Sequence, residues 1–148
     1  MLVDSLTAEE KALFEGICKV KEYQSGQQIV SEEDKGESLL LIRKGRAEVR
    51  KKLDAGNFKY LKELGEGDFF GEMSFLAQVP RSASVIALDC CEILELEKAD
   101  FEILIQSNPS IGSKIFKSIA WELASRLRNN NEDLKKAILW AIEGADLS

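Results

Sequence analysis

The sequence predicts a mainly β domain, a sandwich or a barrel, with helices on either side of it. Short segments rich in strand-forming residues fill residues 19–97, at the spacing of about 8–12 residues that is typical of such folds. Turns such as Ser25–Gly26, Lys44–Gly45 and Ala55–Gly56 separate these segments. Before and after this region, apolar residues instead follow helical spacing.

A helix is expected within residues 1–18. Thr7 is a suitable N-cap, because its hydroxyl can accept a hydrogen bond from an amide of the first turn. Glu9 and Glu10 then lie at the positive end of the helix dipole. An apolar stripe with helical spacing follows, formed by Ala12, Leu13, Phe14 and Ile17.

Residues 19–97 hold the predicted strands. Glycines and polar residues interrupt the segments at their ends, as turns between strands require. The predicted strands are Val20–Tyr23, Gln28–Val30, Leu39–Arg43, Ala47–Leu53, Phe58–Leu61, Ala83–Leu88 and Glu92–Leu96. Together they would form the core of the domain.

Residues 98–148 are predicted to form helices. The first begins at Lys98 and ends at Asn108–Pro109, because a residue before proline disfavours the α conformation. The proline itself suits the first turn of a second helix. Apolar residues then recur at helical spacing, and Asn129–Asn131 either extend this helix or cap a further one.

The composition limits the chemistry that the chain can perform. Its 148 residues correspond to a single domain, 1–148, and they include no histidine. This excludes Ser-His-Asp and Cys-His catalysis as well as histidine-ligated metals. Cys18, Cys90 and Cys91 lack metal-ligand spacing, and such unpaired thiols are typical of a reducing cytoplasm. We therefore expect a cytoplasmic protein without histidine-dependent catalysis or a histidine-ligated metal.

The charge balance bears on the partners of the chain. The 20 basic and 26 acidic residues give a net charge of −6, which disfavours nucleic-acid binding because that binding depends on neutralising phosphates. Asp4 stands where an export signal would be basic, and no apolar run approaches the ~20 residues of a membrane-spanning helix. No nucleic-acid partner and no membrane association are expected.

The segment Leu64–Val85 brings together the groups that an anionic ligand requires. Its glycines let the backbone turn sharply and approach a ligand closely. Glu72 opens a stretch long enough for one helical turn, whose free amides suit a phosphate. Arg81 supplies a fork of donors for phosphate oxygens, and Ser82 adds a hydroxyl. A surface salt bridge between Glu72 and Arg81 is the alternative interpretation.

This segment resembles the phosphate-binding cassette of cyclic nucleotide-binding domains, a family that includes kinase regulatory subunits and bacterial catabolite activators. The matching run is Phe70–Gly71–Glu72, followed after a short turn by Pro80–Val85. Upstream, Gly36–Leu39 resembles a strand and turn of the family, although Glu37 stands where an aspartate is more usual. The resemblance implies a double-stranded β-helix (a jelly roll or β-roll) with a cassette at residues 70–85 and C-terminal helices that act as a lid.

The resemblance also implies a role for each candidate site residue. Arg81 would bind the cyclic phosphate, and Glu72 would bind the ribose 2′-hydroxyl. The phosphate and ribose site would consist of Gly71, Glu72, Met73, Arg81, Ser82 and Ala83. The base would be contacted, on this resemblance, by Val49 and Leu61 from the strands and by Arg126, Asn130 and Asn131 from the lid helix.

The resemblance implies a regulatory module that is not an enzyme and needs no metal or cofactor, and in which cyclic nucleotide binding moves the C-terminal helix. Cyclic AMP is favoured by the pattern of that helix. Ser82 leaves a cyclic GMP-selective sensor open, because a hydroxyl after the arginine can also favour guanine. A degenerate scaffold that binds no nucleotide is a further alternative.

Apolar residues at intervals of three and four along residues 110–143 predict a homodimer through the C-terminal helix. The alternative is that the first half of this helix packs only on its own β-domain. The activator relatives continue into a helix-turn-helix module, for which the chain has no room. The output is therefore expected to pass to an effector protein that the sequence does not identify.

Overall fold

The computed structural model describes residues 2–146 of the chain, and their side chains through residue 142. The chain divides into two compact units, Met1–Ile115 and Phe116–Ser148. The first unit contains the strands, and the second is helical.

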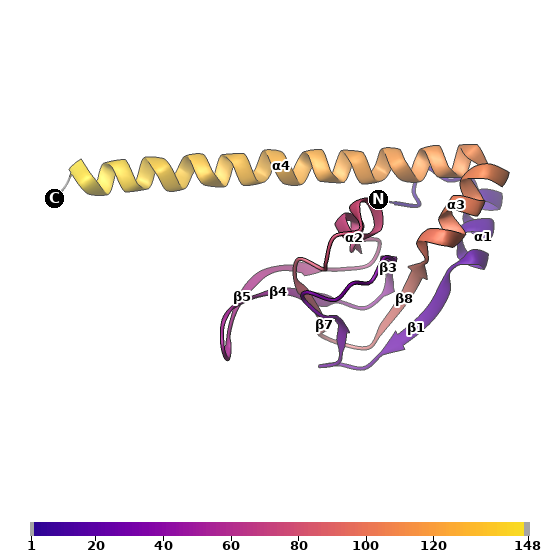
Figure 1. Cartoon of the computed structure of the whole chain (residues 1–148), viewed down its shortest axis with the longest axis horizontal. Coiled ribbons are helices and arrows are strands. Elements are labelled where there is room, and N and C mark those ends of the chain that lie inside the picture. The colour runs from indigo at the N-terminus through magenta and orange to yellow at the C-terminus, as the bar shows by residue number, and fades with distance from the viewer. Residues whose placement is uncertain (1, 147–148) are drawn as a thin grey trace. The chain divides into compact units, whose positions relative to one another are not determined.

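Two four-stranded sheets form the β-region of the first unit. The strand order is β1-β8-β3-β6 in one sheet and β2-β7-β4-β5 in the other, and every pairing is antiparallel. The strands are β1 (Lys19–Tyr23), β2 (Gln28–Val30), β3 (Leu39–Lys44), β4 (Ala47–Asp54), β5 (Asn57–Leu64), β6 (Phe69–Phe70), β7 (Ser84–Ala87) and β8 (Cys91–Leu96). Figure 1 shows them curving around a common interior. The predicted mainly β fold, a β-roll with flanking helices, is confirmed.

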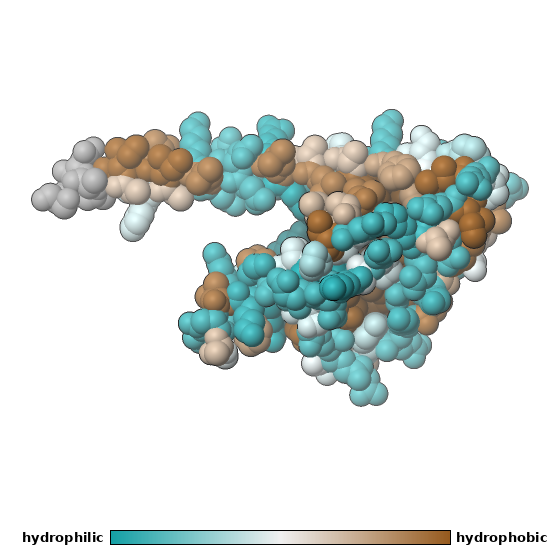
Figure 2. Space-filling model, in the orientation of Figure 1, coloured by the Kyte–Doolittle hydropathy of each residue, from teal (hydrophilic) through white to brown (hydrophobic). Residues whose placement is uncertain are grey.

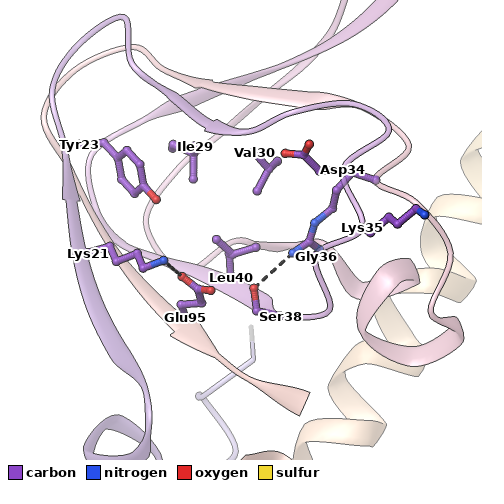
Figure 3. A pocket seen from close by; sticks show the side chains of 11 residues that line it. Lys21, Tyr23, Ile29, Val30, Asp34, Lys35, Gly36, Ser38, Leu40 and Glu95 are labelled. Atoms are coloured by element: carbon purple, nitrogen blue, oxygen red, sulfur yellow. Dashed lines mark hydrogen bonds and ion pairs between the residues drawn. The ribbon is translucent and has the colours of Figure 1, made fainter. Parts of the chain in front are cut away.

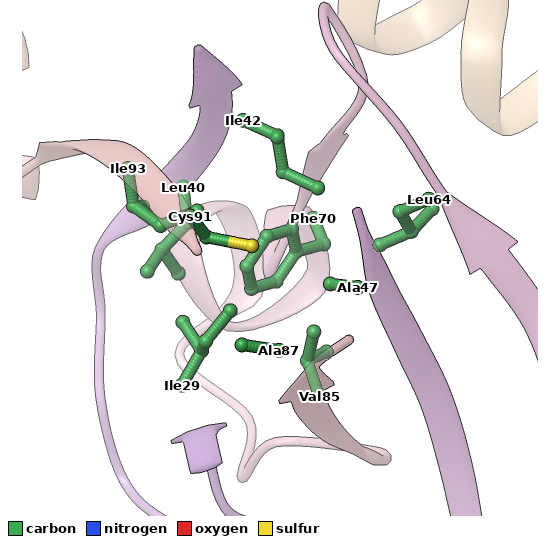
Figure 4. Close-up of a cluster of buried hydrophobic side chains, with 10 residues drawn as sticks. All are labelled: Ile29, Leu40, Ile42, Ala47, Leu64, Phe70, Val85, Ala87, Cys91 and Ile93. Carbon is green, nitrogen blue, oxygen red and sulfur yellow. The ribbon is translucent and has the colours of Figure 1, made fainter. Parts of the chain in front are cut away.

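The interior of the roll is an apolar cluster to which both sheets contribute side chains (Figure 4). Its members are Ile29, Leu40, Ile42, Ala47, Leu64, Phe70, Val85, Ala87, Cys91 and Ile93. Because side chains alternate along a strand, the face of β3 that carries Leu40 and Ile42 also carries Ser38 just before the strand begins. The same alternation on β8 places Glu95 beside Ile93 on the inner face. Two polar residues therefore lie at the edge of an apolar interior.

The carboxylate of Glu10 links two helices of the first unit. Helix α1 (Ala8–Ile17) begins with a capping box, in which Thr7 and Glu10 bond each other's backbone amides. Glu10 also accepts hydrogen bonds from Lys114 at 2.6 Å and Ser110 at 3.0 Å, both in the first turns of α4 (Pro109–Asp146). These bonds, led by that from Lys114, lower the pKa of Glu10 to about 2. The carboxylate thereby ties the two helices together at neutral pH.

The second unit, as far as it is described, is the continuation of α4. The helix runs without a break through Asn129–Asn131 to Asp146, so the asparagines extend it and begin no separate helix. Its later turns expose large apolar side chains, which gather toward the C-terminal end of the helix in Figure 2. They are Leu134, Ile138, Leu139, Trp140 and Ile142. Within residues 2–146, no helix combines the length and the apolar character needed to cross a membrane.

The predicted segments all contain strands, and the differences are local. β5 extends to Leu64, beyond the predicted end at Leu61, because its pairing with β4 resumes after a register shift at Leu61 and continues to Ala47. β7 begins at Ser84 and leaves Ala83 in the preceding bend. The short strand β6, which pairs with β3, was not among the predicted strands because two residues carry no periodicity.

Candidate functional site

The cassette segment forms a strand, a tight turn and a short helix. β6 ends at Phe70, Gly71 adopts a left-handed conformation with φ of 82°, and α2 (Glu72–Ala77) follows. Glu72 is buried at the start of this helix, whereas Met73 is exposed. Phe75, also buried, packs its ring on Phe101 of α3 (Lys98–Ser107), with ring centroids 5.1 Å apart. The helix is therefore anchored on its apolar side while Glu72 remains at the turn.

Arg81 lies almost wholly inside the protein, with 5% of its surface exposed. Its Nη1 donates to the carbonyl oxygen of Gly71 at 3.1 Å, and its Nη2 donates to Oγ of Ser38 at 3.2 Å. Burial lowers the pKa of the guanidinium, while nearby carboxylates, with Glu95 foremost, oppose that effect. An arginine remains charged at any physiological pH. The first unit thus holds a desolvated cation whose neutral acceptors use only part of its five-donor fork.

The segment that precedes β3 holds the backbone of the same arginine. The amide of Arg81 donates to the carbonyl of Asp34, and the amide of Glu33 donates to the carbonyl of Arg81, both at 2.8 Å. Gly36 lies against the guanidinium so closely that a Cβ there would be 2.9 Å from Nη2. Residues 33–38 therefore fix Arg81 at both its backbone and its head group.

A second clamp holds the residue after the arginine. Lys51 of β4 donates from Nζ to the carbonyl of Ser82 at 2.7 Å and pairs with Glu32 at 3.1 Å. The side chain of Ser82 is exposed, and Ala83 is half-buried. The cassette loop is in this way tied to β4 and to the segment before β3, with the hydroxyl of Ser82 left on the outside.

A cavity of about 300 Å³ opens beside the guanidinium (Figure 3). Arg81 and Gly36 line it together with Lys21, Ser38 and Glu95. Lys21 pairs with Glu95 at 2.6 Å. Burial acts to raise the pKa of Glu95, but hydrogen bonds from Lys21 and Ser38 outweigh it and the pKa lies below its usual value. Charged groups therefore surround Arg81 on this side as well.

The two strand residues predicted to contact a base lie close together on the second sheet. Val49 is half-buried and packs against the interior cluster. The pairing of β4 with β5 shifts between Val49 and Arg50, which leaves Leu61 as the extra residue of a bulge opposite them. Leu61 is 46% exposed. Such bulges redirect side chains, and here the redirected side chain is apolar and accessible.

The three lid residues belong to the second unit. Arg126 pairs with Glu122 one turn earlier in the helix, with 3.2 Å between Nε and Oε1. Asn130 and Asn131 lie on exposed turns of α4. The predicted contacts of these three residues with a base stay predictions. Among the described side chains, no group of three histidine, cysteine, aspartate or glutamate residues could hold a metal ion.

Comparison with known proteins identifies the family of this chain. Residues 20–108, more than half of the chain, match the family model described as the cyclic nucleotide-binding domain. The chain belongs to this family. Its β-roll is therefore that of a cyclic nucleotide-binding domain, as the resemblance implied.

Three relatives illustrate the breadth of the cyclic nucleotide-binding domain family. A cAMP-dependent protein kinase regulatory subunit of Eremothecium gossypii is 36% identical over 70% of this chain and 22% of its own length. A cyclic AMP receptor protein of Thermus thermophilus is 32% identical over 90% of this chain and 60% of its own. The crystal structure of the Thermus thermophilus catabolite activator protein superposes with a TM-score of 0.80 at 32% identity, over 90% of this chain and 61% of that one. The chain thus spans less than two thirds of these relatives.

Several residues around Arg81 were not among the predicted site residues. Ser38 bonds the guanidinium from 43 positions away in the sequence, and Gly36, Lys21 and Glu95 line the adjoining cavity. The resemblance had marked Gly36–Leu39 only as a strand and turn. Ser38 lies two residues before the inward-facing Leu40, but the all-apolar strand Leu39–Ile42 does not reveal from sequence which face is inward.

Replacement of Gly71 by alanine is expected to destabilise the first unit by about 1–2 kcal/mol, because a Cβ disfavours the left-handed backbone that this residue adopts. The added atom would also lie 3.1 Å from the Ser38 carbonyl and 3.2 Å from Leu40, and would collide with the Arg81 head group. Denaturant unfolding of the two proteins measures the difference. Gly65→Ala in the same segment, where a Cβ has open space and φ is not positive, is the matched control. Equal stability of Gly71→Ala and Gly65→Ala would contradict the strained turn.

Proposed function

We propose that the chain binds a cyclic nucleotide, with cyclic AMP preferred, and that binding regulates a partner through the C-terminal helix. The observation that carries this proposal is the buried guanidinium of Arg81 within a cassette of the cyclic nucleotide-binding domain family. A buried cation whose donors are only partly used is suited to a phosphodiester anion. The proposed activity is binding and not catalysis.

The phosphate site consists of Arg81 and the groups around it. The guanidinium offers its remaining N–H donors, and the exposed hydroxyl of Ser82 lies one residue further on. No side chain caps the turn at Gly71, so Met73 and its neighbours leave backbone amides for the ligand. Gly71, Glu72, Met73, Arg81, Ser82 and Ala83 are accordingly the proposed phosphate and ribose residues.

Glu72 is proposed to accept a hydrogen bond from the ribose 2′-hydroxyl. Its carboxylate is buried at the turn and contributes to the field that Arg81 experiences, so the anion and the cation lie within reach of one ligand. A cyclic ribose phosphate presents a hydroxyl beside an anion. The pair Glu72 and Arg81 matches this order of groups.

Val49 and Leu61 are proposed to pack against the base, because they present apolar surface at the bulge of β5. Arg126, Asn130 and Asn131 are proposed to complete the base site from α4. An amide can both donate to and accept from a base edge, which suits adenine. The preference for cyclic AMP agrees with the names of the kinase and receptor relatives. Ser82 keeps cyclic GMP as the second candidate.

Movement of the C-terminal helix is proposed as the output. A ligand shifts this helix only as far as it binds one arrangement of the chain better than another. The partner that receives the signal is proposed to be a protein, because the net charge of −6 disfavours nucleic acid.

The exposed apolar turns of α4 support a homodimer. Leu134, Ile138 and Trp140 are 60%, 51% and 77% exposed, and large apolar side chains gathered in one place mark interaction surfaces.

We further propose a reducing compartment, consistent with the cytoplasm, because Cys18, Cys90 and Cys91 are all free.

Calorimetric titration with cyclic AMP and cyclic GMP is expected to show binding to the wild type. Arg81→Ala is expected to weaken the binding free energy by about 2–5 kcal/mol, the scale for truncating one partner of a buried charge pair. Arg46→Ala, which removes an exposed arginine paired with Asp89 and Glu63, is the matched control and leaves affinity unchanged. Both tryptophans, Trp121 and Trp140, lie on α4, so their fluorescence in the same titration reports movement of that helix. No heat with either nucleotide at millimolar concentration would refute the proposed function.

The ribose contact predicts that 2′-deoxy cyclic AMP binds more weakly than cyclic AMP by about 1.5–3 kcal/mol, the value of a hydrogen bond to a charged group. In Glu72→Gln this difference between the two ligands is expected to shrink, because the amide accepts less strongly than the carboxylate. Competition against a fluorescent cyclic nucleotide measures both ligands on both proteins. Equal affinities for the wild type would remove Glu72 from the ribose site.

The dimer predicts that Leu134→Glu combined with Ile138→Glu raises the dimer dissociation constant at least about tenfold, because charge replaces apolar contact. Sedimentation equilibrium measures the mass with and without nucleotide. Ile103→Glu, at a 64% exposed position on α3, is the matched control and leaves the mass unchanged. A wild-type chain that is monomeric at all concentrations would contradict the dimer.

A further inference from the structure

A chain of polar groups leads from Arg81 to the surface of the first unit. Nη2 of Arg81 donates to Oγ of Ser38 at 3.2 Å, and the side chain of Glu95 lines the same cavity as these two groups. Lys21 closes the chain with a 2.6 Å ion pair to Glu95. Figure 3 shows Lys21, Glu95 and Ser38 pointing into one cavity from β1, β8 and the segment before β3.

Because these polar groups are buried, their charges interact strongly with one another. Ser38 and Arg81 are each 5% exposed and Glu95 is 9% exposed, so water screens them little. Lys21, by contrast, has 46% of its side chain exposed, and it holds Glu95 from the solvent side. The order of the groups from inside to outside is therefore cation, hydroxyl, anion and cation.

Glu95 is the principal counter-charge of the guanidinium. Burial lowers the pKa of Arg81, and among the carboxylates that oppose this effect Glu95 comes ahead of Asp34 and Glu72. The hydrogen bond that Lys21 donates to Glu95 has the largest influence on the pKa of Lys21, and it raises that pKa above its usual value. The pair is thus fully ionised at neutral pH, and its negative member lies on the side of Arg81.

We propose that Glu95 sets the affinity of the site for the cyclic phosphate, as a built-in anion that shares a cavity with Arg81 and against which the ligand must compete. Lys21 moderates it by neutralising part of its charge. The proposal rests on the proposed function, because it concerns the same arginine. It adds two residues from β8 and β1 that nothing in the cassette sequence indicates.

The sign of the effect follows from the charges. A phosphate that reaches Arg81 comes under the influence of a second anion, Glu95, in a poorly screened interior. Removing the charge of Glu95 removes this repulsion and strengthens binding. Removing Lys21 leaves Glu95 unmoderated, takes a positive charge from the neighbourhood, and weakens binding. A purely structural role would instead make both substitutions weaken binding.

The test measures the dissociation constant of cyclic AMP for the full chain by calorimetry. Glu95→Gln keeps the shape of the side chain and removes its charge, and it is expected to lower the constant by about three- to tenfold, because a poorly screened repulsion of the phosphate is lost. Lys21→Met is expected to raise the constant by a similar factor. In the double variant the effect of Lys21→Met becomes smaller, because it acts largely through Glu95.

Glu92→Gln is the matched control for the loss of one negative charge. Glu92 is the acid of another ion pair on β8, with Arg43 and Lys44, and its side chain follows the opposite face of the strand. Its substitution is expected to leave the affinity unchanged. Thermal unfolding without ligand shows whether each variant is folded, and Lys21→Met tests the proposal independently of Glu95→Gln.

The outcomes separate the two proposals. If the wild type binds cyclic AMP but Glu95→Gln binds it equally or more weakly, the role of Glu95 is overturned while the proposed function stands. If Lys21→Met and Glu95→Gln shift the constant in the same direction, the role is likewise overturned. If the wild type binds neither cyclic AMP nor cyclic GMP, both proposals fall.

Discussion

The desolvation of one guanidinium is the constraint around which the first unit is arranged. Taking a charged group out of water costs several kcal/mol unless hydrogen bonds and counter-charges offset the loss. For Arg81 the offset comes from a carbonyl of the turn before α2, a hydroxyl before β3 and a carboxylate of β8. Because these groups belong to different parts of the chain, the arginine can be buried only when both the cassette and the first sheet are folded. The site is in this sense a product of the whole roll.

Close packing around the arginine follows from the same constraint. Two glycines, Gly36 and Gly71, face the head group where a Cβ would collide with it. The segment from Glu33 to Ser38 bonds the backbone of Arg81 and then its side chain, so one stretch of chain determines both where the residue lies and where its guanidinium points. A long, flexible side chain is thereby held as firmly as a core residue. This preorganisation reduces the entropy that a ligand would otherwise have to supply.

The sequence predicted the parts of the site that are local and missed those that depend on register. Gly71, Glu72 and Arg81 lie within one short segment, in which α2 separates the turn from Arg81 by so few residues that Arg81 bonds the carbonyl of Gly71. Ser38 reaches the arginine because the register of β3 puts it on the inward face of that strand. Leu39 to Ile42 are all buried, so the uniform apolar character of the strand does not reveal from sequence which face points inward.

Helix propensity gave a similarly ambiguous signal at Asn129–Asn131. Asparagine disfavours a helix interior by less than about 1 kcal/mol per residue, and it does not block a hydrogen bond as proline does. A helix already under way therefore continues through three asparagines, as α4 does. The order of the strands in the two sheets, in contrast, depends on long-range pairing between segments and has no local signature.

The groups that make a buried cation tolerable also limit what a ligand can gain from it. In the absence of ligand, the field of Glu95 and the acceptors Ser38 and Gly71 stabilise Arg81. An arriving anion therefore gains only the difference between its own interaction and those already present. A stronger set of internal partners would give a more stable fold and a weaker site, and a weaker set would give the reverse. The affinity of such a site is consequently determined by the partners of the arginine as much as by the arginine itself.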